Sequence, residues 1–159
     1  MTFPRPSLPS APLLLVPAAA LAAVAAWWFW PAAAQGGGLT PDDPATVASG
    51  RAVYAAQCAA CHGPNLEGAR DWQVRGADGT MPAPPHDATG HTWHHDGETL
   101  FRLTKYGVAA LIGDPDYRSD MPAYEGILTD AEIWAVLSYI KSTWPEEIRA
   151  RHDLMEENR

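Results

Sequence analysis

Cysteine and histidine side chains come together in one short stretch of the sequence, QCAACHG at residues 57–63. Cys58 and Cys61 are the only two cysteines in the chain, and His62 follows the second directly. On a helical turn, positions i, i+3 and i+4 lie on one face, so these three side chains would point to the same side. Thiols and imidazoles serve redox chemistry, metal binding or cofactor attachment. The spacing therefore predicts one chemical site at residues 58–62.

The surroundings of the motif distinguish between four kinds of cysteine site. If the chain is exported from the cytoplasm, as its N-terminal segment suggests below, the oxidising surroundings would favour a disulfide. A Cys-x-x-Cys loop, however, is usually redox-active rather than structural. A thioredoxin-like site needs a strand before the motif, whereas the preceding residues have a helical pattern. Zinc usually takes four ligands, and the chain has no second cysteine pair. The remaining interpretation is C-x-x-C-H as the attachment site of one covalent haem c, held by Cys58 and Cys61, with His62 on the iron.

A methionine is the expected sixth ligand, because His/Met ligation gives a low-spin electron carrier with a raised potential. The chain has four methionines, of which Met1 and Met155 lie at the start and in a charged tail. Met121 lies in a loop between two predicted helices, where Pro122 stiffens the chain as it passes over the opposite haem face. Met81 lies in a Gly- and Pro-rich stretch and is expected to be partly exposed. We therefore predict Met121 as the second axial ligand.

Three amphipathic segments must position these ligands. They are residues 44–60, 97–106 and 129–144. Each begins with a capping signal, and in the third Thr129 and Glu132 form a capping box. Residues 63–96 between the first two have almost no periodicity and many Gly and Pro residues, and so long a loop usually indicates disorder or function. A haem explains it as the core around which the loop wraps, so we predict an all-α fold built on the cofactor.

The N-terminal part has a different character. Residues 11–34 contain no charged side chain, and Arg5 is the only one before them. A bilayer span needs roughly 20 apolar residues, and the positive-inside bias places the following chain on the periplasmic side. Three tryptophans at the outer end favour a retained single-pass anchor in the cytoplasmic membrane, while Ala32, Ala33 and Ala34 also fit a signal-peptide cleavage site that would leave a soluble periplasmic protein.

These observations divide the chain into four parts. We predict an anchor or signal segment at 1–34, a flexible linker at 35–42, a haem domain at 43–145 and a charged tail at 146–159, the tail being a solvated helix. The formal net charge is −8 and the isoelectric point about 5.0. This acidity argues against nucleic acid and anionic lipid surfaces as partners and leaves a basic protein surface as the expected docking site.

From about residue 43 to residue 144 the chain resembles the small single-haem class I cytochromes c of bacterial respiratory chains. The resemblance rests on G-x-x-x-Y-x-x-x-C-x-x-C-H, beginning at Gly50, and on Met121-Pro122 ahead of a last helix that contains L-S-Y-I-K. It implies the cytochrome c fold, in which the first and last helices cross at right angles. That crossing would press Gly50 and Tyr54 against Val136 and Tyr139.

The resemblance also implies further cofactor-binding residues. In the family a proline carbonyl accepts a hydrogen bond from the second nitrogen of the haem-binding histidine, which fixes that ring. Pro84 and Pro85 are the candidates in the PAPP stretch, and we predict Pro85. Trp93 and Arg102 are predicted to face the haem propionates, with ordinary packing or exposure as the alternative.

Four histidines in the loop before the second helix depart from a minimal cytochrome. They are His86, His91, His94 and His95. Imidazoles can bind copper or zinc, and Met81 could add a soft ligand. The alternative, which we favour, is a polar loop whose histidines form local hydrogen bonds.

The predicted function is transfer of one electron at a time between a donor and an acceptor of a respiratory chain, both unidentified. Electron transfer makes and breaks no bond, so the prediction is a carrier rather than an enzyme, with no small-molecule substrate. One alternative is a haem enzyme or sensor with an open sixth position. Another is a copper-handling module that uses the histidine loop.

Overall fold

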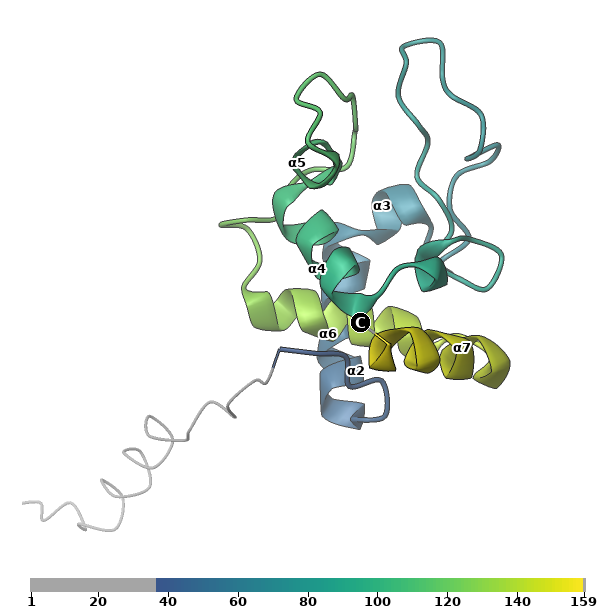
Figure 1. Ribbon diagram of the computed structural model, residues 1–159, viewed down its shortest axis with the longest axis vertical. Helices are drawn as coiled ribbons and strands as arrows, with labels where there is room; N and C mark the ends of the chain where they lie inside the picture. Colours follow the sequence, from purple (N-terminus) through teal and green to yellow (C-terminus); the bar gives the residue numbers. More distant parts are fainter. Residues whose placement is uncertain (1–36, 159) are drawn as a thin grey trace, which may run out of the picture. The chain divides into compact units, whose positions relative to one another are not determined.

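The structure is a computed structural model that describes residues 37–158 (Figure 1). Its elements are α2 (Pro44–Gln57), α3 (Ala59–His62), η1 (Thr92–His94), α4 (Gly97–Tyr106), α5 (Val108–Ile112), α6 (Asp130–Ser142) and α7 (Glu146–Glu157), where η1 is a 3-10 turn. Among these residues there is no strand, only an isolated bridge between Glu125 and Leu128. The all-α prediction is confirmed for this range. The predicted N-terminal hydrophobic helix lies outside the described residues.

None of the helices within residues 37–158 combines the length and the hydropathy that a membrane span requires. The predicted anchor or signal segment at residues 1–34 therefore stays a prediction.

Helix α2 begins as its sequence predicts and ends earlier. The Asp43 carboxylate accepts hydrogen bonds from the backbone N–H groups of Ala45 and Thr46, and Pro44 occupies the first helical position. The helix was predicted to reach residue 60, but it stops at Gln57. The chain turns at Cys58 and resumes as α3, the short helix that carries the rest of the C-x-x-C-H motif.

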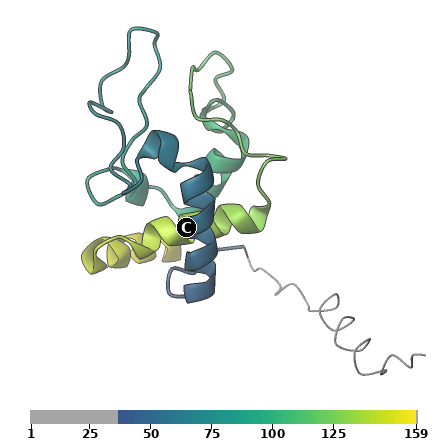
Figure 2. The same ribbon diagram turned by 180° about the vertical axis from the view of Figure 1, so that it is seen from behind.

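The crossing of α2 and α6 is the framework of the domain (Figure 2). Gly50 is buried at the crossing, where a Cβ atom would collide with the backbone carbonyl of Ala135 and lie 2.9 Å from the Cβ of Tyr139. The ring of Tyr54 packs 5.5 Å from that of Tyr139 and also contacts Val136 in the core. The contacts expected of Gly50 and Tyr54 are therefore confirmed, because only a residue without a side chain lets the two backbones come this close.

Helices α4 and α6 provide a second core beside the crossing. Leu100 and Phe101 of α4 pack against Ile133 and Leu137 of α6, and all four are buried. The caps are those that the sequence predicts: Asp96 accepts from the backbone of Thr99 in α4, and the capping box of α6 is complete. Helix α6 ends at Ser142, two residues before the predicted end.

Part of the predicted flexible linker is packed. Leu39 lies against the second core, and the backbone N–H of Thr40 donates to the Ser138 hydroxyl at 2.9 Å. The prediction of a tether that extends to residue 42 is therefore wrong for these residues, because Leu39 gains by packing its apolar side chain against the core formed by α4 and α6.

The charged tail is a helix, as predicted, but it is not solvated all round. His152 of α7 is fully buried and lies between two partners: its Nδ1 is 3.0 Å from Lys141 Nζ, and its Nε2 is 3.0 Å from the carbonyl of His95. Lys141 also pairs with Asp153 at 2.5 Å. The pattern of charges hides this contact because few apolar residues take part in it: the buried His152 and the partly buried Ile148 pack against the rest of the domain.

Two irregular segments, residues 63–91 and 113–128, rise on the same side of the crossing in both views (Figures 1 and 2). The first is the long loop that the sequence predicts. The second was predicted to begin earlier, but residues 108–112 form α5, a helix of five residues between Gly107 and Gly113 that is too short to show a periodic pattern.

Candidate functional site

A cavity of about 780 Å³ is lined by the two irregular segments, by five helices, α2 to α6, and by residues in and around η1. Its wall includes the C-x-x-C-H motif on one part and apolar side chains of α4 and α6 on another, such as Leu100, Leu137 and Ile140. This volume lies in the range that cofactors and drug-sized ligands occupy in proteins, roughly 300–1,000 Å³. The lining therefore combines reactive groups with an apolar enclosure.

The cysteine motif forms a helical turn on this wall. The backbone N–H groups of Cys61 and His62 both donate to the Cys58 carbonyl, at 3.1 and 2.9 Å, and all three residues line the cavity. Both thiols are free rather than joined in a disulfide. Burial, and to a lesser degree Cys61, raises the pKa of Cys58 to about 11. The protonated thiol is a poor nucleophile, which disfavours disulfide exchange.

His62 is held by one nitrogen and offers the other. The ring is buried, and its Nδ1 lies 2.8 Å from the Pro84 carbonyl. A carbonyl can only accept, so Nδ1 carries the proton and Nε2 keeps the lone pair with which imidazole binds a metal. Burial lowers the pKa of His62, and the bond to the carbonyl opposes that shift. This is the arrangement of an axial ligand.

The carbonyl that binds His62 is that of Pro84, so the prediction of Pro85 for this role is wrong by one residue. The Pro85 carbonyl turns away and accepts from the Thr92 hydroxyl at 3.4 Å. Two glycines that pack closely against Pro84 and Pro85 determine which of the two carbonyls faces His62. A Cβ atom on Gly68 would lie 2.7 Å from the carbonyl carbon of Pro84, and one on Gly90 would collide with the Pro85 carbonyl. Sequence alone gives no measure of that close approach.

Both candidate methionines, Met81 and Met121, line the cavity and are half-buried. The segment that carries Met121 is anchored by its neighbour Tyr124, whose hydroxyl donates to the Gln57 carbonyl at 2.8 Å and whose backbone N–H donates to the Thr104 carbonyl at 3.1 Å. Tyr124 was not predicted as a site residue. The only feature of the sequence that could have indicated a role for Tyr124 is its position three residues after Met121, the predicted ligand.

Trp93 and Arg102, predicted to face haem propionates, do not line the cavity. Arg102 is exposed on α4. Trp93 packs against the core of Tyr54 and Val136, and its Nε1–H is buried without an acceptor among the described residues. An unpaired buried donor is costly unless another group satisfies it. Trp93 therefore has a buried N–H group without an acceptor among the described residues, and Arg102 is not part of the cavity wall.

The four loop histidines stack on aromatic rings or on each other rather than converging. His86 stacks on His62 at 4.0 Å between ring centroids, His91 on Trp72 at 5.1 Å, and His94 on Trp93 at 3.7 Å. His95 meets His91 edge to face, and its carbonyl binds His152. Within residues 37–158 no three His, Cys, Asp or Glu side chains gather as metal ligands do. This arrangement does not support the copper-handling alternative.

The donor set of the cavity fits a covalently attached haem. Two free thiols and an imidazole share one helical turn, the imidazole is tautomerically fixed, and thioethers face the same volume. Tyr54, which was predicted only as a packing residue, supports the turn from behind because its hydroxyl donates to the Gly63 carbonyl at 2.8 Å. Burial raises the pKa of Tyr54, so the hydroxyl remains a donor.

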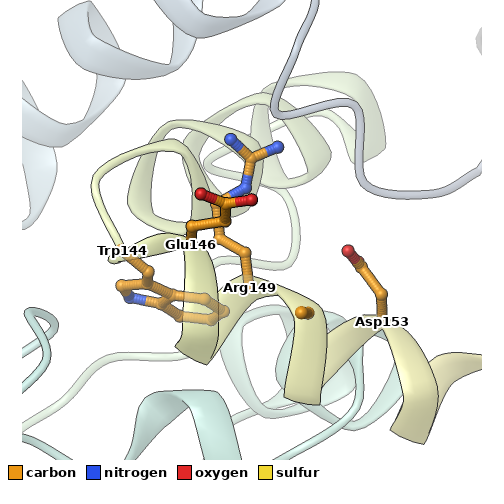
Figure 3. A pocket seen from close by; sticks show the side chains of 5 residues that line it. Trp144, Glu146, Arg149 and Asp153 are labelled. Carbon is orange, nitrogen blue, oxygen red and sulfur yellow. The ribbon is translucent and has the colours of Figure 1, made fainter.

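A second depression, of about 500 Å³, lies over Trp144 and one side of α7 (Figure 3). Its other lining residues are Glu146, Arg149, Ala150 and Asp153. This charged surface has no thiol or imidazole and shares no residue with the cavity wall, so it is separate from the haem site.

Comparison with known proteins agrees with this chemistry. The family model of cytochrome c matches residues 47–144. A relative described as the cbb3-type cytochrome c oxidase subunit CcoP of Azospirillum sp. (strain B510) is 34% identical over 98 residues, which cover 62% of this chain and 29% of that subunit. The chain thus spans less than a third of that relative, and no solved structure matches it. The chain therefore belongs to the cytochrome c family, with Cys58 and Cys61 as the attachment points of a covalent haem.

Proposed function

We propose that this chain is a single-haem cytochrome on the periplasmic side of the cytoplasmic membrane that carries one electron at a time between respiratory-chain partners, with His62 and Met121 as axial ligands of the iron. The observation that carries the proposal is the cavity, in which an imidazole with a free Nε2 and a thioether face the same enclosed volume. When bound, the haem iron supplies the one-electron couple. The protein then has to hold, enclose and tune it.

Met121 is the better candidate of the two methionines. Met81 lies three residues before Pro84, whose carbonyl holds Nδ1 of His62, so its segment approaches from the side of the ring that points away from the iron. Met121 lies on the other irregular segment, tied to α2 and α4 through Tyr124. This anchoring lowers the ordering entropy that ligation by Met121 would cost.

Replacement of each methionine by leucine tests the ligand. We expect Met121→Leu to abolish the weak long-wavelength absorption band of methionine sulfur on ferric iron, to lower the midpoint potential and to let the reduced protein bind carbon monoxide. Met81→Leu is the matched control, since it removes a thioether from the same cavity and should leave all three properties unchanged. The reverse result would assign the ligand to Met81. Carbon monoxide binding by the unaltered protein would favour the enzyme or sensor alternative.

A terminal-oxidase complex is the class of partner that the relative suggests. Because that relative is described as a subunit of a cbb3-type cytochrome c oxidase, we infer that this chain exchanges electrons with an oxidase of this kind or belongs to one. The net charge of −8 favours docking on a basic surface. Electron transfer to oxidase-containing membranes should therefore slow as ionic strength rises. A rate that does not depend on salt would contradict charge-guided docking.

The N-terminal segment is proposed to keep the haem domain at the membrane. Residues 11–34 have the length and apolar character of a span. Fractionation of cells that make the full chain should leave the haem-stained band in the membrane pellet after a high-salt wash. A haem-stained band in the periplasmic extract, shortened by about the mass of this segment, would instead indicate a cleaved signal peptide.

A further inference from the structure

His86 stands out among the four loop histidines because its ring lies on that of His62. The two ring centroids are 4.0 Å apart and the planes differ by 24°, a face-to-face stack. No other aromatic ring among the described residues stacks on His62 in this way, since Tyr54 approaches His86 and not His62. His86 also lines the cavity. The flat ring of His86 is thus in direct contact with one face of the His62 ring, whose Nε2 is the atom proposed to bind the haem iron.

His86 is itself held from three directions. Its Nδ1 lies 2.8 Å from the Thr92 hydroxyl, its backbone N–H donates to the Leu66 carbonyl at 2.8 Å, and its carbonyl accepts from Trp144 Nε1 at 2.9 Å. Leu66 is buried and has a φ of 71°, a left-handed conformation that costs free energy in a residue with a side chain. The fold maintains this unfavourable conformation at the point where the Leu66 carbonyl binds the backbone of His86.

The hydrogen bond between His62 and Pro84 does not by itself fix the ring. It restrains Nδ1, but the imidazole can still rock about its Cβ–Cγ bond, because the terminal torsion of an aromatic side chain is broad. A second ring packed against one face limits that rocking, since any rotation of His62 would press it into His86. The hydrogen bond sets the tautomer and loosely restrains one edge of the ring, and the stack adds a restraint on the ring face.

We propose that His86 is a positioning residue for His62, whose ring it holds by stacking so that the imidazole plane keeps one orientation over the haem iron. The proposal rests on the proposed function only in taking His62 as an iron ligand. Outer-shell partners of a metal-binding histidine orient it and tune the metal. Here that task is divided between a carbonyl at Nδ1 and a second imidazole at the ring face.

Four single substitutions in the full-length, haem-loaded protein test this role. His86→Leu removes the flat partner, His86→Phe keeps a flat ring without the hydrogen bond, and Thr92→Val removes the hydroxyl that orients His86. His94→Leu is the matched control, because His94 belongs to the same loop but stacks on Trp93 instead. The readouts are the electron paramagnetic resonance spectrum of the ferric protein, which depends on the orientation of axial imidazole planes, and the midpoint potential.

We expect His86→Leu to broaden the signal at the largest g value and to raise the potential, because a loosely held imidazole stabilises ferric iron less. A change of about threefold in the ferric-to-ferrous ratio corresponds to about 28 mV at 59 mV per tenfold for one electron. His86→Phe should restore the narrow signal, Thr92→Val should broaden it partly, and His94→Leu should leave it unchanged. Rescue by phenylalanine separates positioning from a general loss of stability.

An unbroadened signal and an unchanged potential in His86→Leu would overturn the proposal. If His86→Leu does not attach haem, Thr92→Val decides, and a spectrum identical to that of the unaltered protein counts against it. Failure of the proposed function is seen separately, because the long-wavelength band and the carbon monoxide response report the methionine ligand and not the imidazole plane.

Discussion

Two regions of this cytochrome are held together by different means. In the crossing region, formed by α2, α6 and α7, protein atoms pack on protein atoms, as at Gly50 against Ala135 and at the buried His152. In the cavity region, formed by residues 58–95 and 108–128, mostly irregular chain surrounds a cavity of about 780 Å³. Protein interiors are otherwise close-packed. The packing of α2 on α6 at Gly50 therefore needs no cofactor, whereas the haem would supply the core of the cavity region, against which Val136, Leu137 and Ile140 of α6 also lie.

The largest effect should come from removing the haem attachment. The double variant Cys58→Ala/Cys61→Ala should lose all covalent haem, because no thioether bond can form, and haem staining of a denaturing gel checks this. Hydrogen exchange should then become faster in the cavity region and change less in α2 and α6, because the packing of these two helices at Gly50 does not involve the haem. Ala60→Ser, between the two cysteines of the same motif, should keep the haem because both thiols remain. Equal acceleration in both regions would mean that they unfold as one unit.

The crossing region should be broken most effectively at Gly50. Gly50→Ala should lower the free energy of unfolding by about 2–3 kcal/mol, because the added Cβ meets backbone rather than a movable side chain. This cost exceeds the gain of about 1 kcal/mol that alanine brings to a helix interior. Urea unfolding followed by circular dichroism measures it. Ser49→Ala, on the exposed side of the same helix, should be neutral or slightly stabilising. A stabilised Gly50→Ala protein would contradict the close crossing.

His152 should make the crossing region sensitive to acid. Burial, and then the Lys141 ammonium, lowers the pKa of His152, while Glu156, the His95 carbonyl and Asp153 oppose the shift. In the unfolded chain this histidine takes up a proton below about pH 6.5, but in the folded protein only at lower pH. The free energy of unfolding should therefore fall as the pH decreases from about 6.5 towards the folded pKa, and this contribution should be constant above about pH 7.

The measurement is the free energy of unfolding at pH 5 and pH 8. The difference should be smaller in His152→Gln than in the unaltered protein, by at most about 1.4 kcal/mol per pH unit of separation between the two pKa values. His94→Gln changes an exposed ring and serves as the control. If His152→Gln keeps the full acid sensitivity, other groups account for it.

The smallest effect should come from removing one of the hydrogen bonds that join the two regions, that between Trp144 and His86. Trp144→Phe removes the donor that binds the His86 carbonyl but keeps most of the ring in the core. The free energy of unfolding should fall by about 1 kcal/mol, the usual contribution of one hydrogen bond. Amide exchange should become faster around residue 86 and stay unchanged in α2. Faster exchange throughout α2 would show that this contact stabilises the crossing as well.

The helices and the haem attachment site could be predicted because their signals are local. The caps of α2, α4 and α6 are formed by residues within three positions of the helix start, and the thiols and imidazole of the motif share one turn. The prediction failed where an element is short or its packing is polar. Helix α5 has only five residues, and α7 docks through the buried His152 and the partly buried Ile148 in a sequence that is mostly charged.

The sequence by itself determined the all-α fold of the described residues, the covalent attachment of haem at Cys58 and Cys61, and the contact of Gly50 with α6. Only the tertiary structure decided that Pro84 rather than Pro85 binds His62, and that His86 stacks on it. The reason is physical. Spacing along a helix fixes which neighbours share a face, whereas contacts between residues more than 20 positions apart depend on the path of an irregular chain, here set by close approaches at Gly68 and Gly90.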